Sequence, residues 1–230
     1  MVRANLNKDP DDVSKMFDEV AHRYDFLNDL LSVGRTKAWR KVVTAIIAPK
    51  PGMKILDIAA GTGSSSKPLV AKGADVIALD FSEGMLAAGR KRHKEIKFQQ
   101  GDALKLPFTE NTFDVTTISF GLRNTSDTAA ALKEALRVTK QSGRIVICEF
   151  SHPTNKIFRL IYLKYLMRAL PVIAKRISKN PAAYIYLAES IQAWPNQSAL
   201  AQVMRQAGWE SVSWQDLTFG IVAVHIGYKG

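Results

Sequence analysis

Acidic residues beside a glycine-rich turn are the side chains of this chain best suited to chemistry. Residues 55–63 read ILDIAAGTG, in which Asp57 ends an aliphatic run and Gly61 and Gly63 follow. A second apolar run ends at Asp80, seventeen residues past Gly63. Carboxylates at the ends of adjacent parallel strands favour a nucleoside-bearing cofactor, because glycine lets a ligand approach the backbone there. We expect Asp80 to accept two hydrogen bonds from ribose hydroxyls.

Three kinds of nucleotide site compete for this turn. A dinucleotide fingerprint needs a third glycine, but Ser64–Ser66 stand there. A P-loop needs a Gly-Lys pair followed by Ser or Thr, and the chain contains none. The remaining cofactor is S-adenosylmethionine, which has a ribose, an adenine and a methionine tail but no phosphate. The serines could also simply cap the helix that follows.

Each part of this cofactor has a predicted partner. Asp57 and the turn from Gly61 to Gly63 would face the methionine tail, and Asp80 would bind the ribose. Asp102, in the sequence Gly-Asp-Ala after the third expected strand, would accept a hydrogen bond from the adenine amine. Taken singly, each acid is also compatible with a solvated loop or a helix cap.

Alternating apolar segments predict a doubly wound α/β sheet that positions these residues. Strands are expected over 54–58, 75–79, 96–99, 115–120 and 144–150, with helices over 64–71, 83–93 and 127–139. This alternation predicts a parallel sheet covered on both faces. Helices over 13–31 and 37–47 precede it, and 211–218 with 221–228 are expected to close it as an antiparallel pair.

Length and composition predict a single domain over 1–230. We divide it into N-terminal helices (1–50), a cofactor-binding core (53–150), a helical insertion that faces substrate and membrane (155–207) and closing strands (208–230). A single cysteine, Cys148, and the lack of a spanning or signal-like apolar run predict a cytoplasmic protein. No Cys/His cluster has metal-site spacing, so no metal is expected.

The net charge of +11 is concentrated in one segment. Residues 156–179 contain seven Lys or Arg residues and no Asp or Glu, interleaved with aromatic and aliphatic side chains. Such segments lie on anionic membrane surfaces, which predicts peripheral contact at the inner face of the cell membrane. The alternative is a core helix with a solvated basic face. Nucleic acid would also fit the charge, but the Asn-Pro-Pro-Tyr type motif of base methyltransferases is missing after the fourth strand.

Several sequence blocks narrow the class further. They are TISFGLRN at 117–124, YLAESI at 186–191, HIGYK at 225–229 and, near the start, Met16-Phe17-Asp18, Tyr24-Asp25 and Asn28-Asp29. With the glycine turn, these blocks resemble the ubiquinone/menaquinone C-methyltransferase family over residues 11–229. The short N-terminus and the block at 147–151 resemble its menaquinone-only members. Ala59 departs from the glycine of many methyltransferases, but this family commonly carries alanine there.

The resemblance implies a class I S-adenosylmethionine-dependent methyltransferase with a Rossmann-like, mostly parallel sheet and an antiparallel C-terminal strand. It implies cofactor contacts at Thr62, Asp80, Asp102, Ala103 and Ser119. It also implies C-methylation of demethylmenaquinol, a lipid-soluble substrate, to menaquinol, with S-adenosylhomocysteine as the second product. The alternatives are another small-molecule methyltransferase, including one acting on benzoquinol, and a nucleic-acid methyltransferase as the weaker option.

Methylation of a quinol carbon needs a group that lowers the pKa of the ring hydroxyl, because loss of that proton makes the carbon nucleophilic. Arg123 is always cationic, so it could stabilise the quinolate oxygen or polarise a water molecule. Asn124 could bind the same oxygen, and Tyr24 is a further candidate.

Three other residues rank lower for this chemistry. His152 has a suitable intrinsic pKa, and Glu189 could orient the arginine or form a plain helix salt bridge. His225 is expected to be a buried, hydrogen-bonded histidine. The sequence leaves the prenyl-tail length, the proton acceptor and the oligomeric state open, and a homodimer is one arrangement.

Overall fold

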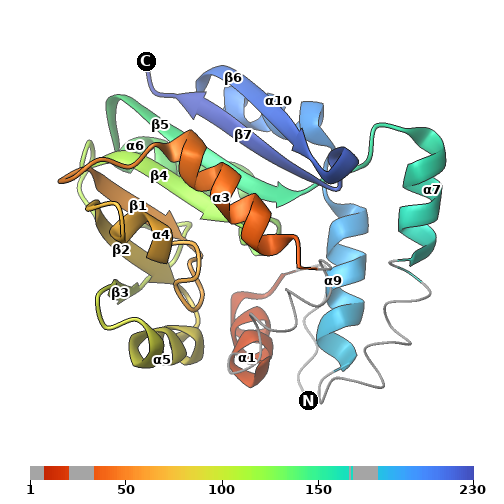
Figure 1. Ribbon diagram of the computed structural model, residues 1–230, viewed down its shortest axis with the longest axis horizontal. Helices are drawn as coiled ribbons and strands as arrows, with labels where there is room; N and C mark the ends of the chain where they lie inside the picture. Colours follow the sequence, from red (N-terminus) through yellow and green to blue (C-terminus); the bar gives the residue numbers. More distant parts are fainter. Residues whose placement is uncertain (1–7, 21–33, 166, 168–180) are drawn as a thin grey trace.

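A seven-stranded sheet in the order β3-β2-β1-β4-β5-β7-β6 forms the centre of the protein (Figure 1). The computed structural model describes residues 8–20, 34–165, 167 and 181–230, and every structural statement below concerns these residues. The strands are β1 Lys54–Ile58, β2 Asp75–Asp80, β3 Lys97–Gln100, β4 Phe113–Ser119, β5 Thr139–Phe150, β6 Glu210–Leu217 and β7 Val222–Tyr228. Strands β1 to β5 pair in parallel, and β7 is antiparallel to both β5 and β6. The predicted class I architecture is confirmed.

Helices cover both faces of this sheet. They are α1 Pro10–Val20, α3 Thr36–Ile47, α4 Lys67–Val70, α5 Glu83–Arg92, α6 Thr128–Val138, α7 Lys156–Lys164, α9 Pro181–Ala193 and α10 Gln197–Gln206. Side chains alternate along β1, so Ile55 packs with α3 on one face, while Leu56 and Ile58 pack with α6 and α10 on the other. Both faces are therefore apolar, as a parallel sheet requires.

Two helices differ from their predicted form, and a third is described only in part. α4 is shorter than the expected 64–71, and the hydroxyls of Ser65 and Ser66, which precede it, donate to Asp57. α10 was predicted within the insertion, but its Leu200 and Met204 lie in the main core, so it covers the sheet. α1 is described as far as Val20, so the remainder of the predicted helix over 13–31 lies outside the described residues.

The carboxyl ends of β1, β2 and β4 lie together at one edge of the sheet. Their register aligns Ile58 with Leu79 on one side and with Ile118 on the other. The residues that follow these strands therefore meet in space although they are far apart in sequence. Ala59 and Phe120, which directly follow β1 and β4, both have a left-handed backbone with φ of 55° and 59°. Such turns redirect the chain away from the sheet and open space above it.

Candidate active site

A cavity of about 560 Å³ lies at this edge of the sheet. Most residues predicted for the cofactor or the chemistry line it: Gly61, Thr62, Asp80, Asp102, Ala103, Ser119, Arg123 and Asn124. Asp57 and Gly63 do not belong to the lining, so direct contact of these two residues with a cofactor stays a prediction. Tyr24 lies outside the described residues.

The glycine turn after β1 needs its glycines for two separate reasons. Gly61 has φ of 56°, and its N–H donates to Asp80 Oδ2 at 2.7 Å, which ties the turn to the end of β2. Gly63 has φ of 81°, and a Cβ there would lie 2.6 Å from Cζ of Phe98. The first glycine therefore faces the cavity, whereas the second allows close packing behind it.

Ala59 is accommodated by a glycine from a distant part of the sequence. A Cβ on Gly121 would lie 2.3 Å from Cβ of Ala59. The alanine that departs from the general methyltransferase pattern thus packs on the glycine of the TISFGLRN block. This pairing links the two blocks that the sequence placed at the ends of β1 and β4.

Asp80 is oriented by backbone amides from both sides. Its Oδ2 accepts from Gly61, and its Oδ1 accepts from the Ser82 N–H at 2.9 Å. Burial raises the pKa of Asp80, while these amides oppose that rise. Each carboxylate oxygen can accept a second hydrogen bond, so Asp80 can still bind two hydroxyls of a ribose.

Asp57 supports the turn from inside the protein. It is fully buried, and its Oδ2 accepts from the hydroxyls of Ser65 and Ser66 at 2.7 and 2.6 Å. Its Oδ1 has no hydrogen-bond partner among the described residues, and burial raises the pKa of this carboxyl to about 6. The predicted helix-capping role of the serines is thus replaced by bonds to Asp57, and Ser66 makes no side-chain cap bond to α4.

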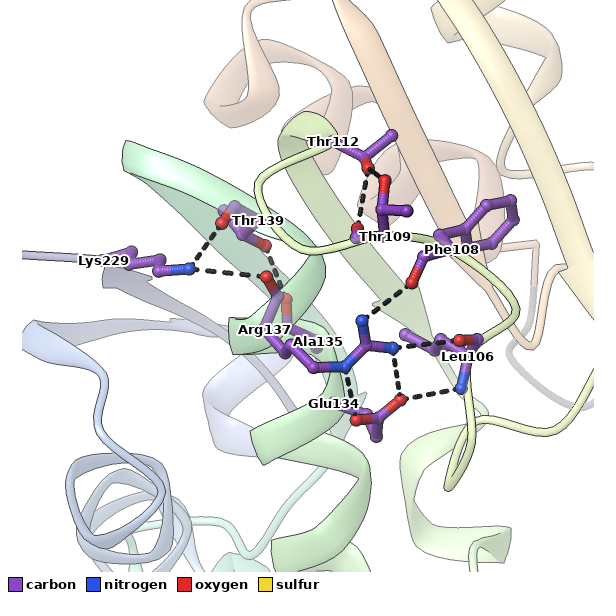
Figure 2. A network of polar contacts seen from close by, with 9 residues as sticks. All are labelled: Leu106, Phe108, Thr109, Thr112, Glu134, Ala135, Arg137, Thr139 and Lys229. Carbon is purple, nitrogen blue, oxygen red and sulfur yellow. Dashed lines mark hydrogen bonds and ion pairs between the residues drawn. The ribbon is translucent and has the colours of Figure 1, made fainter.

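The loop after β3 is held through Leu106 and Phe108 by an ion pair on α6 (Figure 2). Asp102 Oδ1 accepts from the Leu104 N–H at 2.8 Å. Glu134 accepts from the Leu106 N–H at 2.8 Å, and Arg137 donates to the carbonyls of Leu106 and Phe108 at 3.0 and 2.7 Å. Glu134 and Arg137 pair at 2.7 Å, and hydrogen bonds from the arginine lower the pKa of Glu134. Sequence analysis missed this pair, whose only signal is opposite charges three residues apart on a helix.

The other end of the cavity is aromatic and apolar. Trp39, Phe120 and Phe150 line it, with ring centroids 5.1 to 6.5 Å apart. The indole N–H of Trp39 donates to Thr218 Oγ1 at 2.8 Å, which fixes the ring. Tyr162, Leu187, Ile191 and Ile221 complete this wall. The aromatic cluster was not predicted, because its members come from separate segments with no shared motif.

Arg123 reaches the cavity as half of a buried ion pair. It follows β4 in the short 3-10 helix η1 (Leu122–Asn124) and is 3% exposed. Its Nη1 donates to Glu149 Oε1 at 2.9 Å and to the Phe120 carbonyl at 2.6 Å. The guanidinium carbon lies 5.2 Å from the centre of the Phe150 ring. Glu149 therefore orients the arginine, and sequence analysis had not identified it, while a role for Glu189 stays a prediction.

The remaining candidates lie at different distances from the cavity. Asn124 lines it and accepts from the Tyr186 hydroxyl at 3.2 Å. His152 is hydrogen-bonded to the Trp194 carbonyl at 2.7 Å and does not line it. His225 is buried, with its Nε2 2.9 Å from the Gln197 carbonyl, and burial lowers its pKa. Within the described residues, no three His, Cys, Asp or Glu side chains form a group that could hold a metal ion.

These features define an α/β fold with a cavity at the carboxyl ends of its parallel strands, lined by strand-end acids and by aromatic rings. The family model for the ubiE/COQ5 methyltransferase family matches residues 4–229. The chain belongs to this family.

Full-length relatives agree with this assignment, and a solved structure shares the fold. Demethylmenaquinone methyltransferases of Streptomyces avermitilis and Renibacterium salmoninarum are 56% and 55% identical to the chain over 229 residues. The alignments cover 100% of this chain and 99% and 97% of the relatives. The crystal structure of the [4+2]-cyclase SpnF is similar in fold, with a TM-score of 0.70, 15% identity and coverage of 100% of this chain and 97% of that one. Such a likeness shows the fold alone.

Proposed function

We propose that the protein transfers the methyl group of S-adenosylmethionine to a ring carbon of demethylmenaquinol, which yields menaquinol and S-adenosylhomocysteine. The observation that carries this proposal is one cavity with two chemically different ends. Asp80 and Asp102 line the polar end, and Trp39, Phe120 and Phe150 line the aromatic end. The relatives that share more than half of their residues with this chain carry the name of the same activity.

The polar end fits the cofactor in its donor set. Asp80 would accept from the ribose hydroxyls, and Asp102 from the adenine amine. Thr62, Ala103 and Ser119 line the same end and would complete the site. When bound, this cofactor supplies an electrophilic methyl carbon on a sulfonium. The leaving group, S-adenosylhomocysteine, is a neutral thioether, so no acid is needed to assist it. The task left to the protein is to position and activate the ring.

Arg123 and Asn124 would act on the quinol oxygen. Loss of the hydroxyl proton would place negative charge on this oxygen and make the adjacent ring carbon nucleophilic. That carbon would then take the methyl group and lose its hydrogen as a proton, which restores the aromatic ring. Arg123 stabilises the charge on the oxygen, and Asn124 adds a hydrogen bond. Glu149 and the Phe150 ring hold the guanidinium in place. Tyr24 is kept as a third candidate for this site.

Methyl transfer to a naphthoquinol ring tests the proposal directly. The protein is incubated with methyl-labelled S-adenosylmethionine and a short-tailed demethylmenaquinol under reducing conditions. We expect label in the naphthoquinol ring and none with the oxidised quinone, which lacks the activating hydroxyl. A benzoquinol and duplex DNA are tested in parallel. Labelling of either one in preference to the naphthoquinol would contradict the assignment.

We further propose that α7 docks on the anionic inner face of the cell membrane, where the substrate resides. No residue of α7 is buried, and Ile157, Leu160 and Ile161 are 72%, 61% and 60% exposed. Phe219, 78% exposed, lies against Phe158 with ring centroids 5.5 Å apart and extends this apolar surface. Tyr162, on the same helix, lines the cavity. A quinol could therefore pass from the bilayer to the aromatic end.

Vesicle binding tests this docking surface. Lys156 and Lys164 of α7 are exposed, and each basic residue near an anionic surface contributes about 1 kcal/mol. We expect Lys156→Glu with Lys164→Glu to weaken cosedimentation with phosphatidylglycerol vesicles at least about tenfold. Lys72→Glu, an exposed lysine next to α4, is the matched control. Equal binding by both variants would rule out this surface.

In this proposal residues 1–230 act as one methyltransferase domain at the cytoplasmic side of the membrane. None of the helices in the described residues is long and apolar enough to cross a bilayer. Light scattering coupled to size-exclusion chromatography distinguishes a monomer from the homodimer considered above.

A further inference from the structure

Asp18 lies away from the cavity lining, yet it contacts the segment that orients Asp80. Its Oδ1 accepts from the Ser82 hydroxyl and from the Gly84 N–H, the latter at 3.0 Å. Ser82 is 3% exposed and lines the cavity, and its own N–H donates to Asp80 Oδ1 at 2.9 Å. Ser82 therefore connects the carboxylate of Asp18 to the carboxylate of Asp80, which is predicted to bind ribose.

Asp18 completes the N-terminal cap of α5. The Ser82 hydroxyl accepts from the Met85 N–H at 3.1 Å, which is an ordinary helix cap. The Gly84 N–H is one of the first-turn donors that lack a partner inside the helix, and Asp18 supplies that partner from a different helix. The negative charge of Asp18 also lies at the helix end that favours it. The start of α5 is thus held by two caps at once.

Asp18 approaches α5 so closely that a side chain at Gly84 would clash with it. A Cβ at this position would lie 2.5 Å from Asp18 Oδ1, 2.9 Å from its Cγ and 3.1 Å from its Cβ. Gly84 lies inside α5 without a positive φ, so its backbone does not need glycine. Alanine would be the better helix former. The contact with Asp18 is therefore the physical reason for glycine here.

α1 also contacts the cavity directly. Its Val13 and Ser14 line the cavity, and its Met16, 1% exposed, packs against Tyr186 of α9. Tyr186 in turn donates to Asn124. Figure 1 shows α1 between α5 and α9, below the edge of the sheet. A displacement of Asp18 would therefore shift residues that line the cavity, and not only residues on the surface.

We propose that Asp18 is a positioning residue for the cofactor: its carboxylate holds Ser82 and the first turn of α5, and thereby keeps Asp80 in the orientation that accepts ribose hydroxyls. This inference rests on the proposed function, because it concerns the same cofactor. Its consequence is specific. Loss of the contact weakens cofactor affinity, while the rate at saturating cofactor changes little.

Calorimetric titration with S-adenosylhomocysteine tests the role of Asp18. We expect Asp18→Ala to weaken binding about tenfold, since hydrogen bonds to a charged acceptor are lost. Asp18→Asn keeps an acceptor oxygen and should stay within about threefold of the wild type. Gly84→Ala should weaken binding as much as Asp18→Ala, although alanine favours the helix. In turnover assays the two weakened variants should show a raised KM for S-adenosylmethionine with kcat within about twofold.

A carboxylate elsewhere on α1 supplies the control. Asp12→Ala removes a side-chain carboxylate that makes no hydrogen bond among the described residues, and it should bind like the wild type. Wild-type affinity in both Asp18→Ala and Gly84→Ala, with a lowered melting temperature, would reduce Asp18 to a structural contact and overturn the inference. If Asp18→Ala does not fold, Gly84→Ala tests the same contact with Asp18 present. Failure of the wild type itself to bind would instead refute the proposed function.

Discussion

Replacing the two partners of the Arg123–Glu149 ion pair, singly and together, separates catalysis from stability at this site. The side chains are 4% and 1% exposed, and the charged atoms are 2.9 Å apart. At an effective dielectric constant of about 20, the attraction at this distance is about 6 kcal/mol, from which the cost of desolvating both charges must be subtracted. The net value of the pair is therefore small, but the loss of one partner removes this attraction while the other charge stays buried.

Arg123→Met tests the arginine with a neutral side chain of similar length. It leaves the Glu149 carboxylate buried with the N–H groups of Arg123 and Phe150 as its remaining donors in the described structure. We expect unfolding to become easier by about 3–5 kcal/mol, or about 6–20 °C in melting temperature. If Arg123 also stabilises the quinolate oxygen, turnover should fall about 10²–10³-fold while S-adenosylhomocysteine affinity is kept.

Glu149→Gln and the double variant complete the cycle. Glu149→Gln removes the carboxylate charge beside the guanidinium instead, so it should lower stability but reduce turnover less than Arg123→Met. The double variant contains no unpaired charge and should regain most of the stability, because buried pairs can be replaced by neutral groups at little cost. Its turnover should stay low. Recovery of turnover together with stability would refute a catalytic role for Arg123 and leave it a structural one. Urea denaturation and initial rates at saturating substrates provide the two readouts.

Three further changes test other parts of the site. Gly63→Ala should lower the free energy of unfolding by about 1–3 kcal/mol, because it combines a positive φ with a clash at Phe98. Gly52 has a similar φ of 77° but open space around it, so Gly52→Ala should lose only the stability that the backbone strain costs. Equal losses in the two variants would contradict the packing argument. Arg137→Ala should lower the free energy of unfolding by about 1–2 kcal/mol and weaken S-adenosylhomocysteine binding about threefold or more, because the loop of Asp102 loses its hydrogen bonds to Arg137. Unchanged affinity in calorimetry would show that the loop keeps its conformation without Arg137. In the cofactor-free protein, Asp57 keeps its proton up to about pH 6 while the unfolded chain loses it near pH 4, so its contribution to stability is present at pH 4 and lost as the pH rises to 6. Between pH 4 and pH 7, the free energy of unfolding of Asp57→Asn should therefore rise relative to that of the wild type by about 1–3 kcal/mol in urea denaturation. A difference that stays constant over this pH range would count against the raised pKa.

The sequence alone determined the layout of the sheet and most of the polar residues that line one part of the cavity. Local patterns were sufficient, because apolar runs that alternate with helical segments allow few arrangements, and strand ends of a parallel sheet meet at one edge. Asp80, Asp102 and Ser119 directly end or follow such strands, so their convergence followed from topology. The TISFGLRN block identified Arg123 as a further candidate residue for this site.

Only the tertiary structure decided which side chains meet across long sequence separations. Glu149 lies 26 residues from Arg123, and Asp18 lies 64 residues from Ser82, so no local period connects either pair. The same holds for the aromatic wall, in which Trp39 of α3 packs on Phe120 and Phe150. Side-chain contacts of this kind depend on how the helices pack on the sheet, and that packing is fixed by the shape of the whole core rather than by any one segment.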